Sequence, residues 1–111
     1  MNVSKETQQN VEQLQMLEQS LQATLMQKQT ISNQLAEIDN ALQEIGKTEQ
    51  VYKIVGPVMI ATSKKEAQEE LQGKKETITI RLQNLDKQEH KLKERFEQLQ
   101  DDVLKELKTK E

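Results

Sequence analysis

Leu and Ile residues recur along the first half of the chain at alternating spacings of three and four residues. The positions of this first seam are Leu14, Leu17, Leu21, Thr24, Lys28, Ile31, Leu35, Ile38, Leu42 and Ile45. Eight of the ten are Leu or Ile, and the seam becomes polar toward the N-terminus, at Asn10 and Thr7. A repeat kept over more than four heptads predicts a coiled-coil helix over about residues 4–45. We expect this helix to end at Gly46, because glycine readily adopts the left-handed conformation that terminates helices.

A second segment with the same repeat follows residue 63. Its seam positions are Leu71, Lys75, Ile78, Leu82, Leu85, Glu89, Leu92, Phe96, Leu99 and Val103. Ser63 and Glu66 have the spacing of a capping box, which predicts a helix over about residues 64–109. Because the two segments are similar in length and closely connected, we expect them to pair antiparallel. Lys28 lies 17 residues before Ile45 and Glu89 lies 18 residues after Leu71. These two charges are therefore predicted to meet; the alternative is that each extends independently into solvent.

Residues 51–62, between the two helical segments, have a different character. They read VYKIVGPVMIAT, with β-branched and apolar residues on both sides of Gly56-Pro57. Proline cannot donate a hydrogen bond to a strand ladder, so Gly-Pro predicts the turn of a β-hairpin. Both faces of the hairpin are largely apolar, which is typical of strands buried on two sides. An isolated hairpin is marginally stable and exposes unpaired strand edges, so this stretch is expected to pair with other chains.

Composition supports a mainly α fold with a thin core. Of 111 residues, 32% are charged and 2% aromatic, and the mean hydropathy is −0.88, so one domain over residues 1–111 without a thick globular core is expected. The net charge is −3 and the pI about 5.3, which argues against a nucleic-acid partner. Residues 63–111 contain twelve basic and twelve acidic residues, which predicts an ion-paired surface. The absence of Cys, of a membrane-length apolar run and of a signal peptide predicts a soluble intracellular protein.

No arrangement of catalytic residues is visible in the sequence. There is no Gly-rich phosphate loop, no HExxH motif and no EF-hand spacing, and His90 is expected on a solvated helix face. Adjacent acidic pairs such as Glu69-Glu70 do not converge on one metal ion, because neighbours on a helix point in different directions. We therefore expect no enzyme activity, no cofactor and no metal site.

Apolar residues outside the seams collect near the two termini. An antiparallel helix pair brings the termini together, about 60 Å from the hairpin by helix length. The extra apolar residues there are Val3, Val11, Met16, Leu104 and Leu107, and the nearby seam residues are Leu14, Leu17, Leu99 and Val103. Exposed apolar side chains on a polar arm can mark an interaction site, and Met adapts to varied partners. The alternative is that these are frayed coil ends with incidental apolar residues.

The whole chain resembles the β subunits of prefoldin (also called GimC), specifically archaeal ones. The resemblance rests on the helix–hairpin–helix order over about 110 residues and on the central string VYKIVGPVMI. It implies a cytoplasmic heterohexamer of two α and four β subunits, in which the hairpins form a double β-barrel platform. It further implies an ATP-independent chaperone that holds non-native client proteins at the distal coiled-coil tips and passes them to a group II chaperonin.

The resemblance also implies roles for particular residues. The client-binding residues at the tips would be Val3, Val11, Leu14, Met16, Leu17, Leu99, Val103, Leu104 and Leu107. The residues of subunit assembly in the hairpin would be Val51, Tyr52, Ile54, Val55, Val58, Met59 and Ile60. The alternative is a structural or tethering coiled-coil subunit of another complex, whose hairpin only dimerises it. A membrane-surface helix is disfavoured, since neither helix combines a basic face with a wide apolar stripe.

Overall fold

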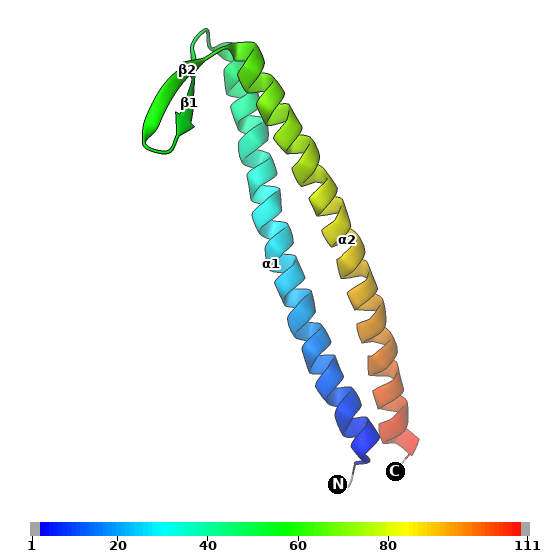
Figure 1. Ribbon diagram of the computed structural model, residues 1–111. Coiled ribbons are helices and arrows are strands. Elements are labelled where there is room, and N and C mark those ends of the chain that lie inside the picture. The colour runs from blue at the N-terminus through cyan, green and yellow to red at the C-terminus, as the bar shows by residue number, and fades with distance from the viewer. Residues whose placement is uncertain (1–2, 110–111) are drawn as a thin grey trace. The chain divides into compact units, whose positions relative to one another are not determined.

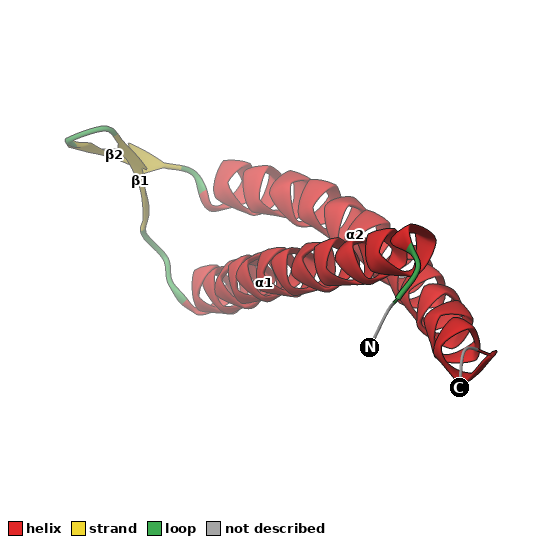
Figure 2. Cartoon of the chain, turned by 90° about the horizontal axis from the view of Figure 1, so that it is seen from below, coloured by secondary structure: helices red, strands yellow, loops and turns green. Residues whose placement is uncertain are grey.

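The computed structural model describes residues 3–109 of the chain. Its elements follow in the order α1 (Lys5–Lys47), β1 (Val51–Val55), β2 (Val58–Thr62) and α2 (Lys64–Thr109), as shown in Figure 1. The predicted fold class, two long helices with a central antiparallel β-hairpin, is confirmed. Figure 2 shows the two strands as a short insertion between the helices.

The two predicted seams form the apolar contact between the helices. All twenty seam positions are buried or half-buried. The most buried apolar residues are Ile31, Leu85 and Val103, and Thr24 is buried as deeply as they are. The core is therefore a narrow stripe along each helix, as the heptad repeat requires.

The chain divides into two compact units, one of residues up to 28 and from 84 on, the other of residues 29–83. We call the first the terminal unit and the second the hairpin unit. In the terminal unit, α1 and α2 are antiparallel, because Thr7 lies beside Glu106 and Lys28 beside Glu89. In the hairpin unit, Lys75 Nζ of α2 lies 2.7 Å from Asp39 Oδ1 of α1.

The hairpin has a simple register and a tight turn. Residues pair from Val51 with Thr62 to Val55 with Val58, and two residues form the turn. Gly56 has a φ of 59°, a conformation that L-residues rarely adopt, and Pro57 follows it. Gly at the first central position and Pro at the second suit a type II′ turn, which matches the twist of a hairpin. Within the hairpin unit, the strands bend back beside the helices (Figure 1).

The helix ends differ in detail from the predicted ones. Helix α1 continues through Gly46 to Lys47, and Gly46 does not have a positive φ, so the predicted glycine termination is wrong. The Lys64 ammonium of α2 donates a hydrogen bond to the Gly46 carbonyl at 3.1 Å, which satisfies one of the carbonyls that have no partner within the helix at this end.

At the start of α2, Ser63 is the predicted N-cap: its Oγ accepts a hydrogen bond from the Glu66 N–H at 3.0 Å. The Glu66 carboxylate accepts a hydrogen bond from the Thr62 hydroxyl at 3.2 Å, whereas a full capping box would direct it to the Ser63 N–H.

Candidate interaction surfaces

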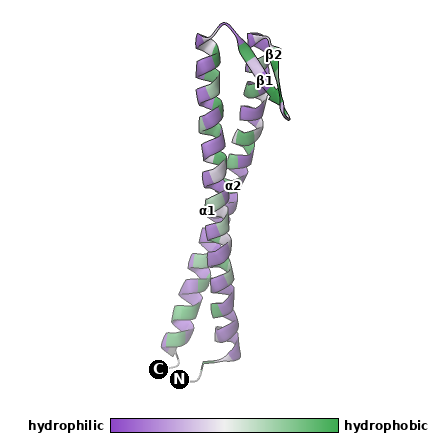
Figure 3. Cartoon of the chain, turned by 90° about the vertical axis from the view of Figure 1, so that its left-hand side faces the viewer, coloured by the Kyte–Doolittle hydropathy of each residue, from purple (hydrophilic) through white to green (hydrophobic). Residues whose placement is uncertain are grey.

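The hairpin presents apolar side chains to solvent on both faces. Six of its seven predicted assembly residues are exposed by about half or more, namely Tyr52, Ile54, Val55, Val58, Met59 and Ile60, and Val51 is half-buried. The register places Tyr52, Ile54 and Met59 on one face and Val55, Val58 and Ile60 on the other. Figure 3 shows the hydrophobic colouring of both strands. An apolar surface of this kind in a polar chain indicates an interface.

The hairpin also has two free edges. In the part of the chain that the structure describes, the sheet has two strands, so the outer side of each carries backbone groups without a strand partner. The hairpin forms one ion pair with α2: Lys53 Nζ lies 3.3 Å from Glu70 Oε2, and both side chains are about half exposed. A surface ion pair of this kind is weak. Part of the hairpin borders a hollow that Ile45 and Leu71 of the helices also line. Its exposed apolar side chains and both its edges are open to pairing.

In the terminal unit, the predicted client-binding residues fall into two groups. Val11, Met16 and Leu104 are exposed, Met16 by 67% and Leu104 by 51%. The remaining six are half-buried or buried, namely the seam residues Leu14, Leu17, Leu99 and Val103 and the residues Val3 and Leu107 outside the twenty seam positions. Val103 is only 6% exposed, so contact with a partner there requires the helices to separate.

A polar cluster that the apolar repeat does not predict joins the ends of the two helices. The Thr7 hydroxyl, in a side chain only 1% exposed, donates a hydrogen bond to Glu106 Oε2 at 2.7 Å, and Asn10 Nδ2 donates to Glu106 Oε1 at 3.1 Å. Ser4 Oγ lies 2.9 Å from the Thr7 hydroxyl and accepts from the Thr7 N–H at 3.1 Å, which caps α1. We call Ser4, Thr7, Asn10 and Glu106 the terminal clasp. Glu106 could have been found, since it is the next seam position after Val103.

Lys28 and Glu89 meet in the seam, as predicted. Lys28 Nζ lies 2.8 Å from Glu89 Oε2 and also 2.7 Å from Asp86 Oδ1, a residue outside the seam. Hydrogen bonds to Asp86 and Glu89 raise the pKa of the Lys28 ammonium above its ordinary value of 10.5. Hydrogen bonds from Lys28 and Lys93 hold the pKa of the Glu89 carboxyl below its ordinary value of 4.5. Both charges are therefore favoured within the seam.

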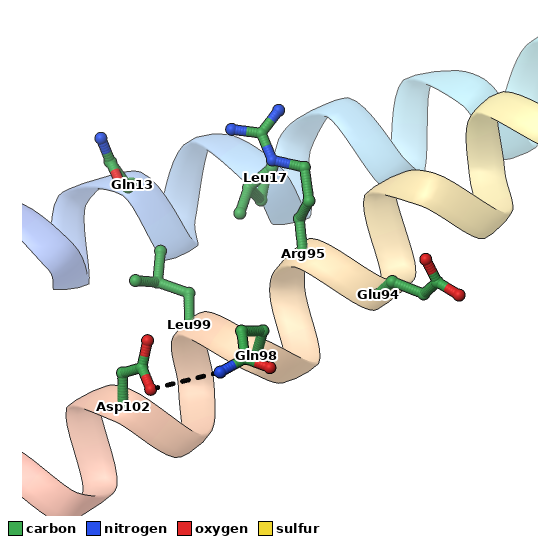
Figure 4. A pocket seen from close by; sticks show the side chains of 7 residues that line it. All are labelled: Gln13, Leu17, Glu94, Arg95, Gln98, Leu99 and Asp102. Carbon is green, nitrogen blue, oxygen red and sulfur yellow. Dashed lines mark hydrogen bonds between the residues drawn. The ribbon is translucent and has the colours of Figure 1, made fainter.

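Two shallow hollows lie along the terminal unit. The first, of about 390 Å³, is drawn in Figure 4 and is lined by Gln13, Leu17, Glu94, Arg95, Gln98, Leu99 and Asp102. There Leu99 points toward α1 and Arg95 rises beside Leu17, while Glu94 points away from α1 (Figure 4). The second, of about 420 Å³, is lined by Asn84, Lys87, Gln88, Lys91, Leu92 and Arg95. Neither has the enclosed shape of a small-molecule site.

Ionisable groups elsewhere on the described chain do not form a reactive cluster. His90 is exposed and its Nε2 lies 2.9 Å from Glu94 Oε1, one turn along the same helix. Among residues 3–109, no three His, Cys, Asp or Glu side chains are placed to hold a metal ion. Neither of the described helices carries an apolar stretch of the length that crossing a membrane needs.

Comparison with known proteins gives a consistent match. Residues 8–110 match the model of the family described as "Prefoldin subunit". The chain is 40% identical over 101 residues to prefoldin subunit beta of Thermococcus onnurineus, covering 88% of this chain and 87% of the relative. It is 39% identical over 99 residues to prefoldin subunit beta of Methanosarcina acetivorans, covering 86% and 85%.

A solved structure agrees with these sequence matches. The crystal structure of the prefoldin beta subunit from Thermococcus strain KS-1 has a TM-score of 0.87 and 36% sequence identity, covering 92% of each chain. Sequence and fold therefore agree over nearly the whole chain: this protein belongs to the prefoldin family of molecular chaperones, as a subunit of the β type.

Proposed function

We propose that this chain is an ATP-independent holdase subunit that captures unfolded proteins at its terminal unit and passes them to a group II chaperonin. In this proposal, its hairpin assembles with prefoldin α subunits into a cytoplasmic hexamer of two α and four β subunits. Membership of a chaperone family supports the role, and we propose no catalytic activity. The structural observation that supports client binding is the exposure of Val11, Met16 and Leu104. These residues lie near the end of the seam at which Thr7 and Glu106 are joined by a hydrogen bond.

Such a surface is suited to clients that share no sequence. Each exposed apolar side chain offers a weak contact, and Met adjusts its shape to different partners. Several arms on one assembly would bind different parts of the same unfolded chain, so that weak contacts combine into useful avidity. Since the sequence carries no nucleotide-binding motif, release would follow from competition or handover rather than from hydrolysis.

The experiment is suppression of aggregation on dilution of a chemically unfolded protein, followed by light scattering. The test variant combines Val11→Gln, Met16→Gln and Leu104→Gln, which leaves the seam intact. Its control combines Leu25→Gln and Ile80→Gln, which are also exposed apolar positions, 47% and 59%, outside the predicted tip. We expect the test variant to lose most of its suppression and the control to keep it.

Two outcomes would contradict parts of the proposal. Failure of the unmodified assembly to suppress aggregation would reject the holdase role and favour a structural coiled-coil subunit. Equal suppression by test and control variants would place client binding elsewhere on the assembly. Native mass spectrometry of the chain mixed with a prefoldin α subunit tests the proposed stoichiometry separately, because it reads mass and not client binding.

A further inference from the structure

Three positive charges form a row along α2 that has no ion-pair partner among the described residues. Lys87, Lys91 and Arg95 are four residues apart, so they lie on one stripe of the helix, and all three are exposed. None of them forms an ion pair or a hydrogen bond within residues 3–109. Like charges at this spacing repel each other, so the row is unfavourable for the isolated helix. We call these three residues the basic row.

The acids near the basic row are engaged by other groups. Lys28 binds Asp86 and Glu89, and Glu94 lies against His90. Helix α1 has no acidic residue between Glu18 and Glu37, and among the described residues no ion pair joins Glu18 to Arg95. The ion-paired surface expected from composition is therefore incomplete at this stretch. A binding partner with negative charges would complete it.

The surface beside the basic row is partly apolar and leads toward the proposed client site. The hollow of about 420 Å³ is lined by all three residues of the basic row and by the seam residue Leu92. Arg95 also lines the hollow of about 390 Å³, where Leu17 and Leu99 lie (Figure 4). Asp102, the other acid in that hollow besides Glu94, accepts a hydrogen bond from Gln98 Nε2 at 3.4 Å. Cations and apolar side chains thus follow one another along the same side of the terminal unit.

We propose that this surface binds extended client segments in which acidic residues are followed by apolar ones. The inference rests on the proposed holdase function and specifies which segments are preferred. Successive members of the basic row are about 6 Å apart along the helix, from a rise of about 1.5 Å per residue. Alternate side chains of an extended chain are separated by about 6.6 Å on one side of the backbone. Acids at every second position of a client segment therefore match the row, and the apolar residues that follow reach Leu17 and Leu99.

The test measures binding of labelled peptides to the full-length chain, in the oligomer it forms, by fluorescence anisotropy. One peptide carries Glu at three alternate positions followed by a short apolar stretch, and its partner peptide has Gln in place of each Glu. The test variant is Lys87→Gln with Lys91→Gln, and Arg95→Gln is measured separately. The matched control is Lys47→Gln with Lys65→Gln, which changes the net charge equally at exposed positions outside the terminal unit.

We expect the unmodified chain to bind the acidic peptide more tightly than the Gln peptide. The Lys87→Gln and Lys91→Gln variant should bind the acidic peptide about fivefold more weakly, or about 1 kcal/mol, with little change for the Gln peptide. The control variant should bind both peptides like the unmodified chain. Added salt should remove the preference for Glu, because it screens exposed charges.

Three results would overturn the inference. Equal affinity of the unmodified chain for both peptides would show that the basic row has no role in client choice, while leaving the holdase function intact. If the control variant weakens binding of the acidic peptide as much as the test variant does, the basic row acts only through the net charge of the chain. Tighter binding of a single-stranded oligonucleotide with the same number of charges would assign the row to nucleic acid. If neither peptide binds, the proposed holdase function itself fails.

Discussion

Thr24 provides a direct test of what polar residues in the seam do. Its side chain is 3% exposed, and its hydroxyl donates a hydrogen bond to the Ser20 carbonyl at 2.9 Å. Valine has nearly the same shape without the hydroxyl. The Ser20 carbonyl lies within α1 and is four residues before Thr24, so it keeps its helical hydrogen bond after the substitution.

The expected size follows from two opposing terms. Moving a hydroxyl from water into an apolar medium that cannot hydrogen-bond costs about 4–8 kcal/mol. In such a medium a hydrogen bond to a carbonyl returns about 4–6 kcal/mol. Thr24→Val should therefore raise the free energy of unfolding by about 1 kcal/mol, which corresponds to a rise of about 4 °C in melting temperature for a chain of this size.

The chain supplies a matched control in Thr77→Val. The Thr77 hydroxyl donates to the Gly73 carbonyl at 3.2 Å, the same local arrangement, but its side chain is exposed. Because that hydroxyl stays in contact with water, the substitution should change stability by less than about 0.5 kcal/mol. Both variants are measured by urea and thermal denaturation followed by circular dichroism. If Thr24→Val lowers stability by 1 kcal/mol or more, the reasoning is refuted and the hydroxyl makes a net stabilising contribution.

Three further predictions concern charge, backbone and assembly. The Lys28–Glu89 pair stabilises the fold between the two ordinary pKa values: the Glu89 share is lost as pH falls below 4.5, and the Lys28 share is lost as pH rises above 10.5. When Lys28 and Glu89 are both replaced by Leu, the melting temperature should be higher at neutral pH and should fall less as the pH is lowered. A large drop in the melting temperature of this variant at neutral pH would contradict the prediction. Gly73→Ala should stabilise α2 by about 1 kcal/mol in urea denaturation, since an added Cβ meets no atom within 4 Å; an unchanged or lower midpoint would show a need for glycine. Ile54→Lys, at a position 73% exposed, should leave the helical circular dichroism unchanged but abolish the oligomer in native mass spectrometry; an intact oligomer would exclude this residue from the interface.

The features that follow from periodicity could be predicted from the sequence. A seven-residue repeat fixes which side chains face the partner helix, so all twenty seam positions, and the meeting of Lys28 with Glu89, could be counted from the sequence. The end of α1 could not, because Lys64 of α2 donates a hydrogen bond to the Gly46 carbonyl, a contact that the heptad pattern does not contain. Local rules identify candidates for helix ends, and tertiary contacts decide among them.

The sequence pattern also could not predict which charged side chains form ion pairs with one another. Equal numbers of acids and bases suggested a neutralised surface, but an ion pair needs suitable spacing and direction as well as number. The acids near residue 90 face Lys28, Lys93 and His90, and the basic row is left without them. For the interaction surfaces, the sequence placed Val103 in the seam and Met16 outside it, and their exposures of 6% and 67% agree with that. It did not predict that Val3 and Leu107, which lie outside the twenty seam positions, are half-buried.

The terminal clasp has a consequence for how much apolar surface the terminal unit can offer. Its hydrogen bonds join Thr7 and Asn10 to Glu106, and water can replace each of them when the helix ends separate. Separating the apolar layers farther along costs more: about 1.5–3 kcal/mol for a fully buried Val or Leu, and less for the half-buried Leu14. We therefore expect opening to begin at the clasp, and its total cost to rise with each layer from Val103 and Leu14 inward. On the proposed function, the area of apolar surface that a client contacts is not fixed. It grows layer by layer, as far as the free energy of client binding exceeds the cost of separating the helices.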